Sequence, residues 1–89
     1  MRFEWDERKR LRNIDKHGLD FRDVFMLFEA PHVIVPSRHS GPEPRSLAIG
    51  AIEGRIVTTV FTRRGANRRI ISLRSARDDE RRHYLQLLS

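Results

Sequence analysis

The first third of the chain changes from an alternating pattern to a helical one. Residues 2–5 alternate polar and apolar side chains, which predicts a short strand with both aromatic residues on one face. Asp6 is a typical helix N-cap residue and opens a polar helix that extends to about His17. Gly18 follows directly, and we expect it to end this helix.

A second helix follows and carries the clearest apolar stripe of the sequence. Asp20 starts it, with Asp23 three residues later in a position like that of a capping box. Its apolar residues recur at the i, i+3, i+4, i+7 spacing of a main core helix: Phe21, Val24, Phe25 and Phe28. Pro31 ends this helix, and residues 32–36, bounded by prolines, predict a short strand near a sheet edge.

The middle of the chain predicts a three-stranded antiparallel meander. Residues 37–46 hold no apolar side chain but hold Gly and Pro, which is typical of a loop. The turns of the meander are expected at residues 53–54 and 63–67. They separate three strand-like segments: 47–52, 55–62 and 68–73.

The last helix and the order of elements define the fold class. Ser75, with Asp78 three residues later, predicts a capped C-terminal helix with a partial apolar face. The order β, α, α, β, β, β, β, α predicts a single α+β domain over residues 1–89. We expect a small antiparallel sheet, the meander plus one or two short strands, packed against two N-terminal helices and one C-terminal helix. The other sheet face, or its rim, would present the arginines.

Composition excludes several classes of protein. With 38% hydrophobic and 34% charged side chains among 89 residues, the chain is typical of a small soluble domain. No run approaches the ~20 apolar residues of a membrane span, and the first residues lack a signal-peptide pattern, so we expect a cytoplasmic protein without membrane contact. The absence of cysteine excludes disulfides, a thiolate nucleophile and cysteine-based zinc sites.

Positive charge is concentrated in the last part of the chain. The net charge is +6, and residues 1–54 contribute none of it. Residues 55–77 hold seven arginines and no acid, so the segment repels itself unless a ligand or an acidic partner relieves it. Arginine binds phosphate with two parallel hydrogen bonds, which makes RNA or DNA the leading partner. The alternative is that the charge serves solubility alone.

The residues suit RNA cleavage better than metal chemistry. The four histidines are not spaced to bind a metal from one helix face, and no metal or cofactor site is expected. RNA carries its own nucleophile, the 2′-hydroxyl, so arginines could stabilise the charged phosphate while other groups move protons. The proton-transfer candidates are Lys16, His17, Glu43, His83 and Tyr84.

Most of these candidates also have a structural interpretation. Lys16 and His17 precede Gly18, where cations interact favourably with the end of a helix. Trp5 is typical of a core position, and His83 and Tyr84 are typical of a helix surface. Three arginines have no acid nearby in the sequence and are harder to assign to structure alone: Arg64, Arg69 and Arg74.

Several of these segments together resemble the BrnT toxins of bacterial type II toxin–antitoxin modules. The similarity covers nearly the whole chain, and Glu43-Pro44-Arg45 fits it only roughly. It rests on Phe3-x-Trp5-Asp6-x-x-Lys9, Asn13-x-x-Lys16-His17-Gly18, Phe21, Pro31, Gly50, Gly54, Thr62-x-Arg64-Gly65, Arg69-Ile70-Ile71-Ser72-x-Arg74-x-Ala76 and Glu80-Arg81-x-x-Tyr84.

The resemblance implies a RelE-like ribonuclease toxin that cleaves RNA and slows growth. It also implies a hetero-oligomer with a BrnA-like ribbon-helix-helix antitoxin. In this complex only the antitoxin would contact operator DNA, and the complex would repress its own operon. The catalytic candidates are Arg64, Arg69, Arg74, Tyr84, Lys16 and His17, with Arg64 and Arg74 assigned to the scissile phosphate. The remaining arginines of the acid-free segment are candidates for RNA binding: Arg55, Arg63, Arg68 and Arg77.

Two other functions agree with the same residues. A non-catalytic nucleic-acid-binding module or co-repressor would bind with strong salt dependence and no turnover. A pure interaction protein would use its basic face to receive an acidic antitoxin.

Overall fold

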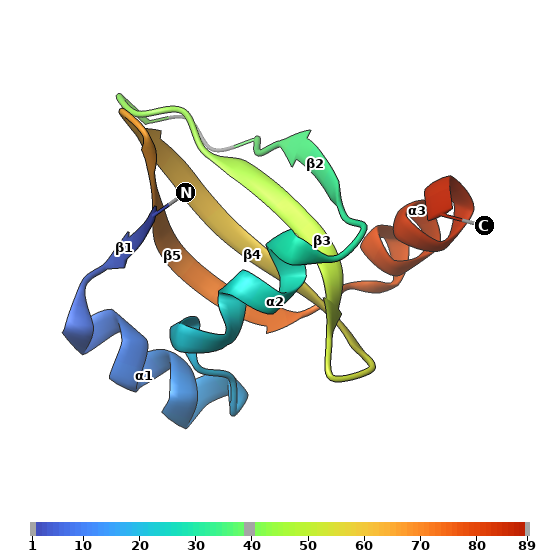
Figure 1. The fold of residues 1–89 in the computed structure, drawn as a ribbon, viewed down its shortest axis with the longest axis horizontal. Helices are drawn as coiled ribbons and strands as arrows, with labels where there is room; N and C mark the ends of the chain where they lie inside the picture. Colours follow the sequence, from blue (N-terminus) through green and yellow to red (C-terminus); the bar gives the residue numbers. More distant parts are fainter. Residues whose placement is uncertain (1, 39–40, 89) are drawn as a thin grey trace.

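The computed structural model describes residues 2–38 and 41–88, and it contains five strands and three α-helices (Figure 1). The short 3₁₀ helix Phe21–Asp23 leads directly into α2. No helix among the described residues is long and apolar enough to cross a membrane. In chain order the elements are β1 (Arg2–Trp5), α1 (Glu7–His17), α2 (Val24–Glu29), β2 (Val33–Pro36), β3 (Ser46–Ile52), β4 (Arg55–Arg64), β5 (Asn67–Ser75) and α3 (Asp78–Leu88).

All five strands form one mixed sheet in the order β1-β5-β4-β3-β2. The α+β class and the β3–β4–β5 meander are confirmed, but the expectation of a small antiparallel sheet is wrong, because β1 pairs with β5 in parallel. The alternation of residues 2–5 fits either strand direction, so the sequence pattern leaves the direction open. In the parallel arrangement both aromatic residues face the core: Phe3 stacks on Phe28, and Trp5 meets Phe21 edge to face.

The caps of α1 form as predicted. The Asp6 carboxylate accepts hydrogen bonds from the backbone N–H groups of Arg8 and Lys9, at 2.8 and 3.2 Å. Gly18 has a φ of 67° and donates its N–H to Ile14 O. This left-handed conformation carries little penalty in glycine, so the helix ends where the sequence predicts.

The second helix is shorter than predicted. Asp20 does cap its start, but the first turn is 3₁₀ and the α-helical part has only six residues. Phe25, expected in the core stripe, is 42% exposed. The helix approaches β3 closely, because a Cβ on Gly50 would lie 2.9 Å from Leu27 Cγ. A glycine at this point of β3 therefore lets α2 pack directly on the sheet.

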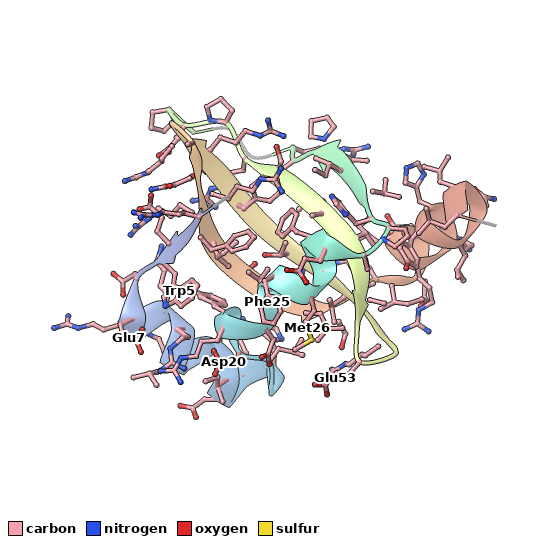
Figure 2. All side chains as sticks on the ribbon, in the orientation of Figure 1. Trp5, Glu7, Asp20, Phe25, Met26 and Glu53 are labelled. Carbon is pink, nitrogen blue, oxygen red and sulfur yellow. The ribbon has the colours of Figure 1, made fainter. Side chains whose placement is uncertain are left out.

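The hydrophobic core lies between the sheet and the segment that contains α2. Figure 2 shows Trp5, Glu7 and Asp20 at one corner of the molecule, where β1, α1 and the turn before α2 meet. There the buried Arg10 pairs with Glu7 and Asp20. The core itself is aliphatic and aromatic: Phe21, Val24, Leu27, Ala48, Ile52, Val57, Phe61, Ile70 and Leu73.

We expected all three helices on one face of the sheet, but the C-terminal helix contacts the sheet from the other face, where Glu80 bonds to Thr58 on β4 and to Arg74 on β5. Its N-terminal cap differs as well, since Ser75 is the last residue of β5, and Glu80 instead accepts a hydrogen bond from the Arg77 backbone N–H at 2.8 Å. This bond anchors the first turn, while α3 projects away from α1 and α2 (Figure 1). Three of its apolar side chains are exposed: Leu85, Leu87 and Leu88.

Candidate active site

The sheet has two unlike faces. One is covered by α1 and α2 and contributes the core described above. The other, which we call the open face, carries the alternate residues of the same strands. They include Val35, Leu47, Ile49, Thr58, Val60, Arg64, Arg69 and Arg74.

A β-bulge places Arg69 and Arg74 on the same face. These two residues are five positions apart, so a regular strand would point them in opposite directions. The pairing shifts between Val60 and Phe61, where Ser72 and Ile70 are the partners on β5 and one residue is left over. Strict alternation could not have predicted this arrangement.

Each of the three candidate catalytic arginines has a carboxylate partner from another part of the chain. Arg74 pairs with Glu80 at 2.7 Å, Arg69 with Glu4 at 3.1 Å, and Arg64 with Glu43 at 3.2 Å. The sequence suggested that the arginine-rich segment has no compensating acids. The structure shows that it does have them. Folding brings these acids to it, and the pairs orient the guanidinium groups on the open face.

The Arg74–Glu80 pair is the most buried of the three. Both terminal nitrogens of Arg74 donate to Glu80, at 2.7 and 3.0 Å, and Glu80 also accepts from the hydroxyl of Thr58 and the Arg77 backbone N–H. Burial by itself would raise the pKa of Glu80, but these hydrogen bonds outweigh it and lower the pKa to about 2. Glu80 is thus ionised at neutral pH and holds Arg74 in one orientation.

A cleft of about 750 Å³ lies on the open face between α3 and the edge formed by β2 and β3. Its floor is aliphatic, with Val35, Leu47, Ile49 and Val60. Arginines stand on both sides: Arg38 and Arg45 from the β2–β3 connection, and Arg74 and Arg77 from the other side. His83 and Asp79 of α3 also line it. A concave site that combines an apolar floor with cations suits a ligand that has both apolar and anionic parts.

Arg64 and Arg74 do not meet at one phosphate. In the β4–β5 pairing Arg74 lies opposite Thr58, whereas Arg64 is six residues further along β4. At 3.3 Å per residue the two positions are about 20 Å apart along the sheet. Arg74 therefore belongs to the cleft, while Arg64 and Arg69 lie towards the β4–β5 turn.

Lys16 and His17 do not line the cleft. They end α1, on the side of the sheet opposite the open face. Burial, followed by the charges of Lys16, Arg74 and Arg55, lowers the pKa of His17. Tyr84 is half-buried on α3 and is likewise not among the cleft residues.

In the motif Asn13-x-x-Lys16-His17-Gly18, the residues Asn13 and Gly18 have a structural role. Asn13 is buried and its side-chain amide pairs with the backbone of Leu73: Nδ2 donates to the carbonyl at 2.8 Å, and Oδ1 accepts from the N–H at 3.1 Å. Together with the helix end at Gly18, this contact fixes α1 against β5.

The candidate RNA-binding arginines are spread over both faces. Arg77 lines the cleft, and Arg55 donates to the Ser75 hydroxyl at 2.5 Å. Arg63 is exposed and pairs across the strands with Arg68. Arg68 lies over the rings of Phe28 and Phe61, at 4.4 and 5.4 Å from their centroids, on the helix-covered face.

Residues 5–80 match the sequence model of a family described as "Ribonuclease toxin, BrnT, of type II toxin-antitoxin system". The chain belongs to the BrnT family. The comparison with curated proteins gives no match. BrnT membership implies a ribonuclease toxin with an RNA target and an antitoxin partner.

This BrnT chain contains cleft residues that its sequence did not single out as a site. Arg38 and Arg45 flank the polar segment between β2 and β3, and the backbone bond from Ser37 N–H to Arg45 O, 3.0 Å long, draws the ends of that segment together. His83 was a proton-transfer candidate without a place in the expected site. Only the pairing of β2 with β3 and the direction of α3 bring these residues to Arg74. Among the described residues of this BrnT protein, no group of three or more His, Asp or Glu side chains could hold a metal ion.

Proposed function

We propose that the protein is a metal-independent endoribonuclease, a RelE-like cytoplasmic toxin that cleaves RNA in the cleft beside α3 and so inhibits translation and growth. Membership of the BrnT family supports the ribonuclease activity. The observation that carries the location is Arg74, whose two-pronged bond to Glu80 fixes a permanent cation at the wall of an open cleft. A fixed cation stabilises developing charge without having to reorganise during the reaction.

The proposed reaction uses the nucleophile of the substrate. The 2′-oxygen attacks the neighbouring phosphorus, the bond from phosphorus to the 5′-oxygen breaks, and the products are a 2′,3′-cyclic phosphate and a 5′-hydroxyl. Arg74 and Arg77 stabilise the negative charge on the phosphate oxygens, because both line the cleft.

His83 is the proposed proton-transfer group. It lines the cleft together with both arginines, and imidazole is the side-chain group that enzymes use most often for general acid–base catalysis. Its neutral ring accepts the proton of the 2′-hydroxyl and returns that proton to the leaving 5′-oxygen. The competing assignment gives the proton transfer to one of the candidates from the family resemblance: Lys16, His17 or Tyr84.

The remaining arginines of the open face extend the proposed binding surface. Arg69 and Arg64 follow Arg74 towards the β4–β5 turn, so a strand that runs along the sheet would meet one after another. Arg68 is left out of this surface because its guanidinium lies against two rings on the other face.

The proposed partner is a BrnA-like ribbon-helix-helix antitoxin. It would neutralise the toxin in a hetero-oligomer, and the complex would bind operator DNA through the antitoxin and repress its own operon. The net charge of +6 supports an acidic contact surface on that partner.

The function is tested by cleavage of a defined RNA and of its 2′-deoxy counterpart by the purified chain in excess EDTA, with identification of the product ends. We expect cleavage of the RNA alone and a 2′,3′-cyclic phosphate end. Binding of both strands without a cut would favour the non-catalytic module, and loss of activity in EDTA would contradict the metal-free mechanism.

Variants in α3 and at the residue just before it test the location. His83→Asn should reduce cleavage about 100-fold. Arg77→Gln should reduce it about 10-fold. The matched control is Arg81→Gln, an exposed arginine on the next turn that does not line the cleft. Equal losses in Arg77→Gln and Arg81→Gln would show that only overall charge matters, and an unchanged rate in His83→Asn would move the proton transfer to Tyr84, Lys16 or His17.

A further inference from the structure

Three aliphatic residues of the cleft floor lie side by side on neighbouring strands. Val35 on β2 lies directly opposite Leu47 on β3, and Leu47 lies directly opposite Val60 on β4. The three side chains therefore form one straight row across three neighbouring strands. With strands about 4.8 Å apart, this aliphatic row is about 10 Å long.

No other described element of the chain fills the space above this row. The two N-terminal helices pack on the other face of the sheet, and α3 stands beside the row and leaves the cleft of about 750 Å³ open. All three side chains of the row are only half-buried. An apolar surface at the bottom of a cleft gains free energy when a ligand removes it from water.

From this geometry we infer that the Val35–Leu47–Val60 row is a binding site for the flat face of an unpaired RNA base, next to the phosphate-binding arginines. The inference rests on the proposed function and adds the class of substrate: single-stranded RNA, or RNA with a base turned out of its stack. In a duplex both faces of each base are stacked, so a base must leave the helix before it can lie on the sheet.

The charge around the row fits this ligand. Arg38 and Arg45 stand on one side, and Arg74 and Arg77 stand on the other. A nucleotide offers a flat apolar base and a phosphate joined to it, which match the floor and the rim together. Inorganic phosphate would use the rim alone, and a duplex would present phosphates without a free base face.

The floor also determines how selective the site is. Aliphatic side chains have no hydrogen-bond donors or acceptors, so they cannot distinguish the edges of the four bases. We therefore expect this position to accept every base, with little preference for sequence. Preference elsewhere along the RNA would have to come from other contacts.

The test measures the affinity of the purified chain for uncleavable 2′-O-methyl RNA hexamers by fluorescence anisotropy. The probes are an intact single strand, a series in which one nucleotide at a time is abasic, and a fully paired duplex. We expect one abasic position to weaken binding by about fivefold or more, because the missing base no longer removes the aliphatic row from water. The duplex should bind more weakly than the intact single strand.

Two neighbouring residues on β2 supply a matched pair of variants. Val35→Thr keeps the side-chain shape but makes the row polar, whereas Ile34→Thr changes the next residue, which is 38% exposed and points to the opposite face. Val35→Thr should weaken the intact hexamer about fivefold and leave the abasic hexamer unchanged, and Ile34→Thr should change neither. Should Val35→Thr fail to fold, Val60→Thr makes the same test from β4.

Each outcome decides between named alternatives. The base-binding site would be overturned if intact and abasic strands bound with equal affinity, or if Val35→Thr weakened both equally. The aliphatic floor would then be assigned to contact with a partner protein. Cleavage without this discrimination would overturn the site but keep the ribonuclease. Discrimination without cleavage would keep the site and overturn the ribonuclease.

Discussion

Arg68 and Arg74 lie on the same strand, and the structure uses them in two different ways. Arg68 is on the helix-covered face, where its guanidinium lies over the rings of Phe28 and Phe61 and the pKa is lowered by burial and by the charge of Arg63. Arg74 is on the open face, where Glu80 holds both of its terminal nitrogens beside the cleft.

This difference shows how one charge can serve packing or binding. Aromatic rings attract a cation without neutralising it, and they leave no room for an anion on the face they cover. A carboxylate neutralises part of the charge but fixes its direction, and the other face of the guanidinium can still meet a ligand. The identity of the neighbour, more than the arginine itself, decides which role follows.

The largest effect is expected where the open-face pair is broken. Glu80→Gln removes the ionised partner of Arg74 and should lower the free energy of unfolding at pH 7 by about 3 kcal/mol, because the pKa of Glu80 falls from an ordinary 4.5 to about 2 in the fold. A carboxyl with a lowered pKa stabilises the protein above its unfolded pKa, and this contribution is lost as the pH falls from about 4.5 towards 2.

Urea unfolding as a function of pH measures this contribution. The wild-type chain should lose stability through that pH window, while Glu80→Gln should show a flatter profile there. A profile of the same steepness in both proteins would mean that the pair does not stabilise the ionised form.

A second experiment separates the two arginines by activity. Arg74→Lys keeps the charge but loses the planar fork, so we expect RNA cleavage to fall about 100-fold. Arg68→Lys makes the same change on the other face and should alter the rate less than threefold. Initial rates on one RNA substrate measure both, and equal losses would show that the face of the sheet does not matter.

The ring contacts of Arg68 predict a smaller effect on stability. Arg68→Gln removes the cation from Phe28 and Phe61 and should lower the free energy of unfolding by about 1 kcal/mol. Thermal unfolding measures the change. No loss of stability would indicate that the rings gain nothing from the cation above them.

The smallest effect is expected at the exposed end of the open face. In the Arg64–Glu43 pair the side chains are 50% and 44% exposed, so Arg64→Gln should cost at most about 0.5 kcal/mol. The difference should shrink in high salt, as for other surface pairs. A loss as large as that of Glu80→Gln would contradict the contrast between a buried and an exposed pair.

The sequence predicts those parts of the fold that depend on local chemistry. Asp6 and Gly18 mark the ends of α1 correctly because each acts on its own neighbours along the chain. The direction of β1 could not be predicted, since it is defined only by its pairing with β5, which lies at the other end of the sequence. The bulge of β5 was equally hidden, because it appears only when β5 is paired with β4.

In the candidate site, too, local features could be predicted from the sequence, whereas contacts between distant residues could not. The arginine-rich segment is visible in the composition, and its positive charge pointed to RNA. The partners that orient it come from elsewhere: Glu4 is 65 residues from Arg69, and Glu43 is 21 residues from Arg64. Arg38 and Arg45 reach the cleft through the pairing of β2 with β3, which no local pattern specifies.

The side chain of Asn13 has a consequence for how copies of the chain meet. The pairing of β1 with β5 ends at Ile70, but β5 continues to Ser75, so part of its outer edge lacks a neighbouring strand. A bare strand edge is a template on which another molecule can add its own strand and start an aggregate. The Asn13 amide occupies the backbone groups of Leu73 at this position, as a residue of one more strand would. Helix α1 thereby blocks the β5 edge at Leu73 from within the same molecule.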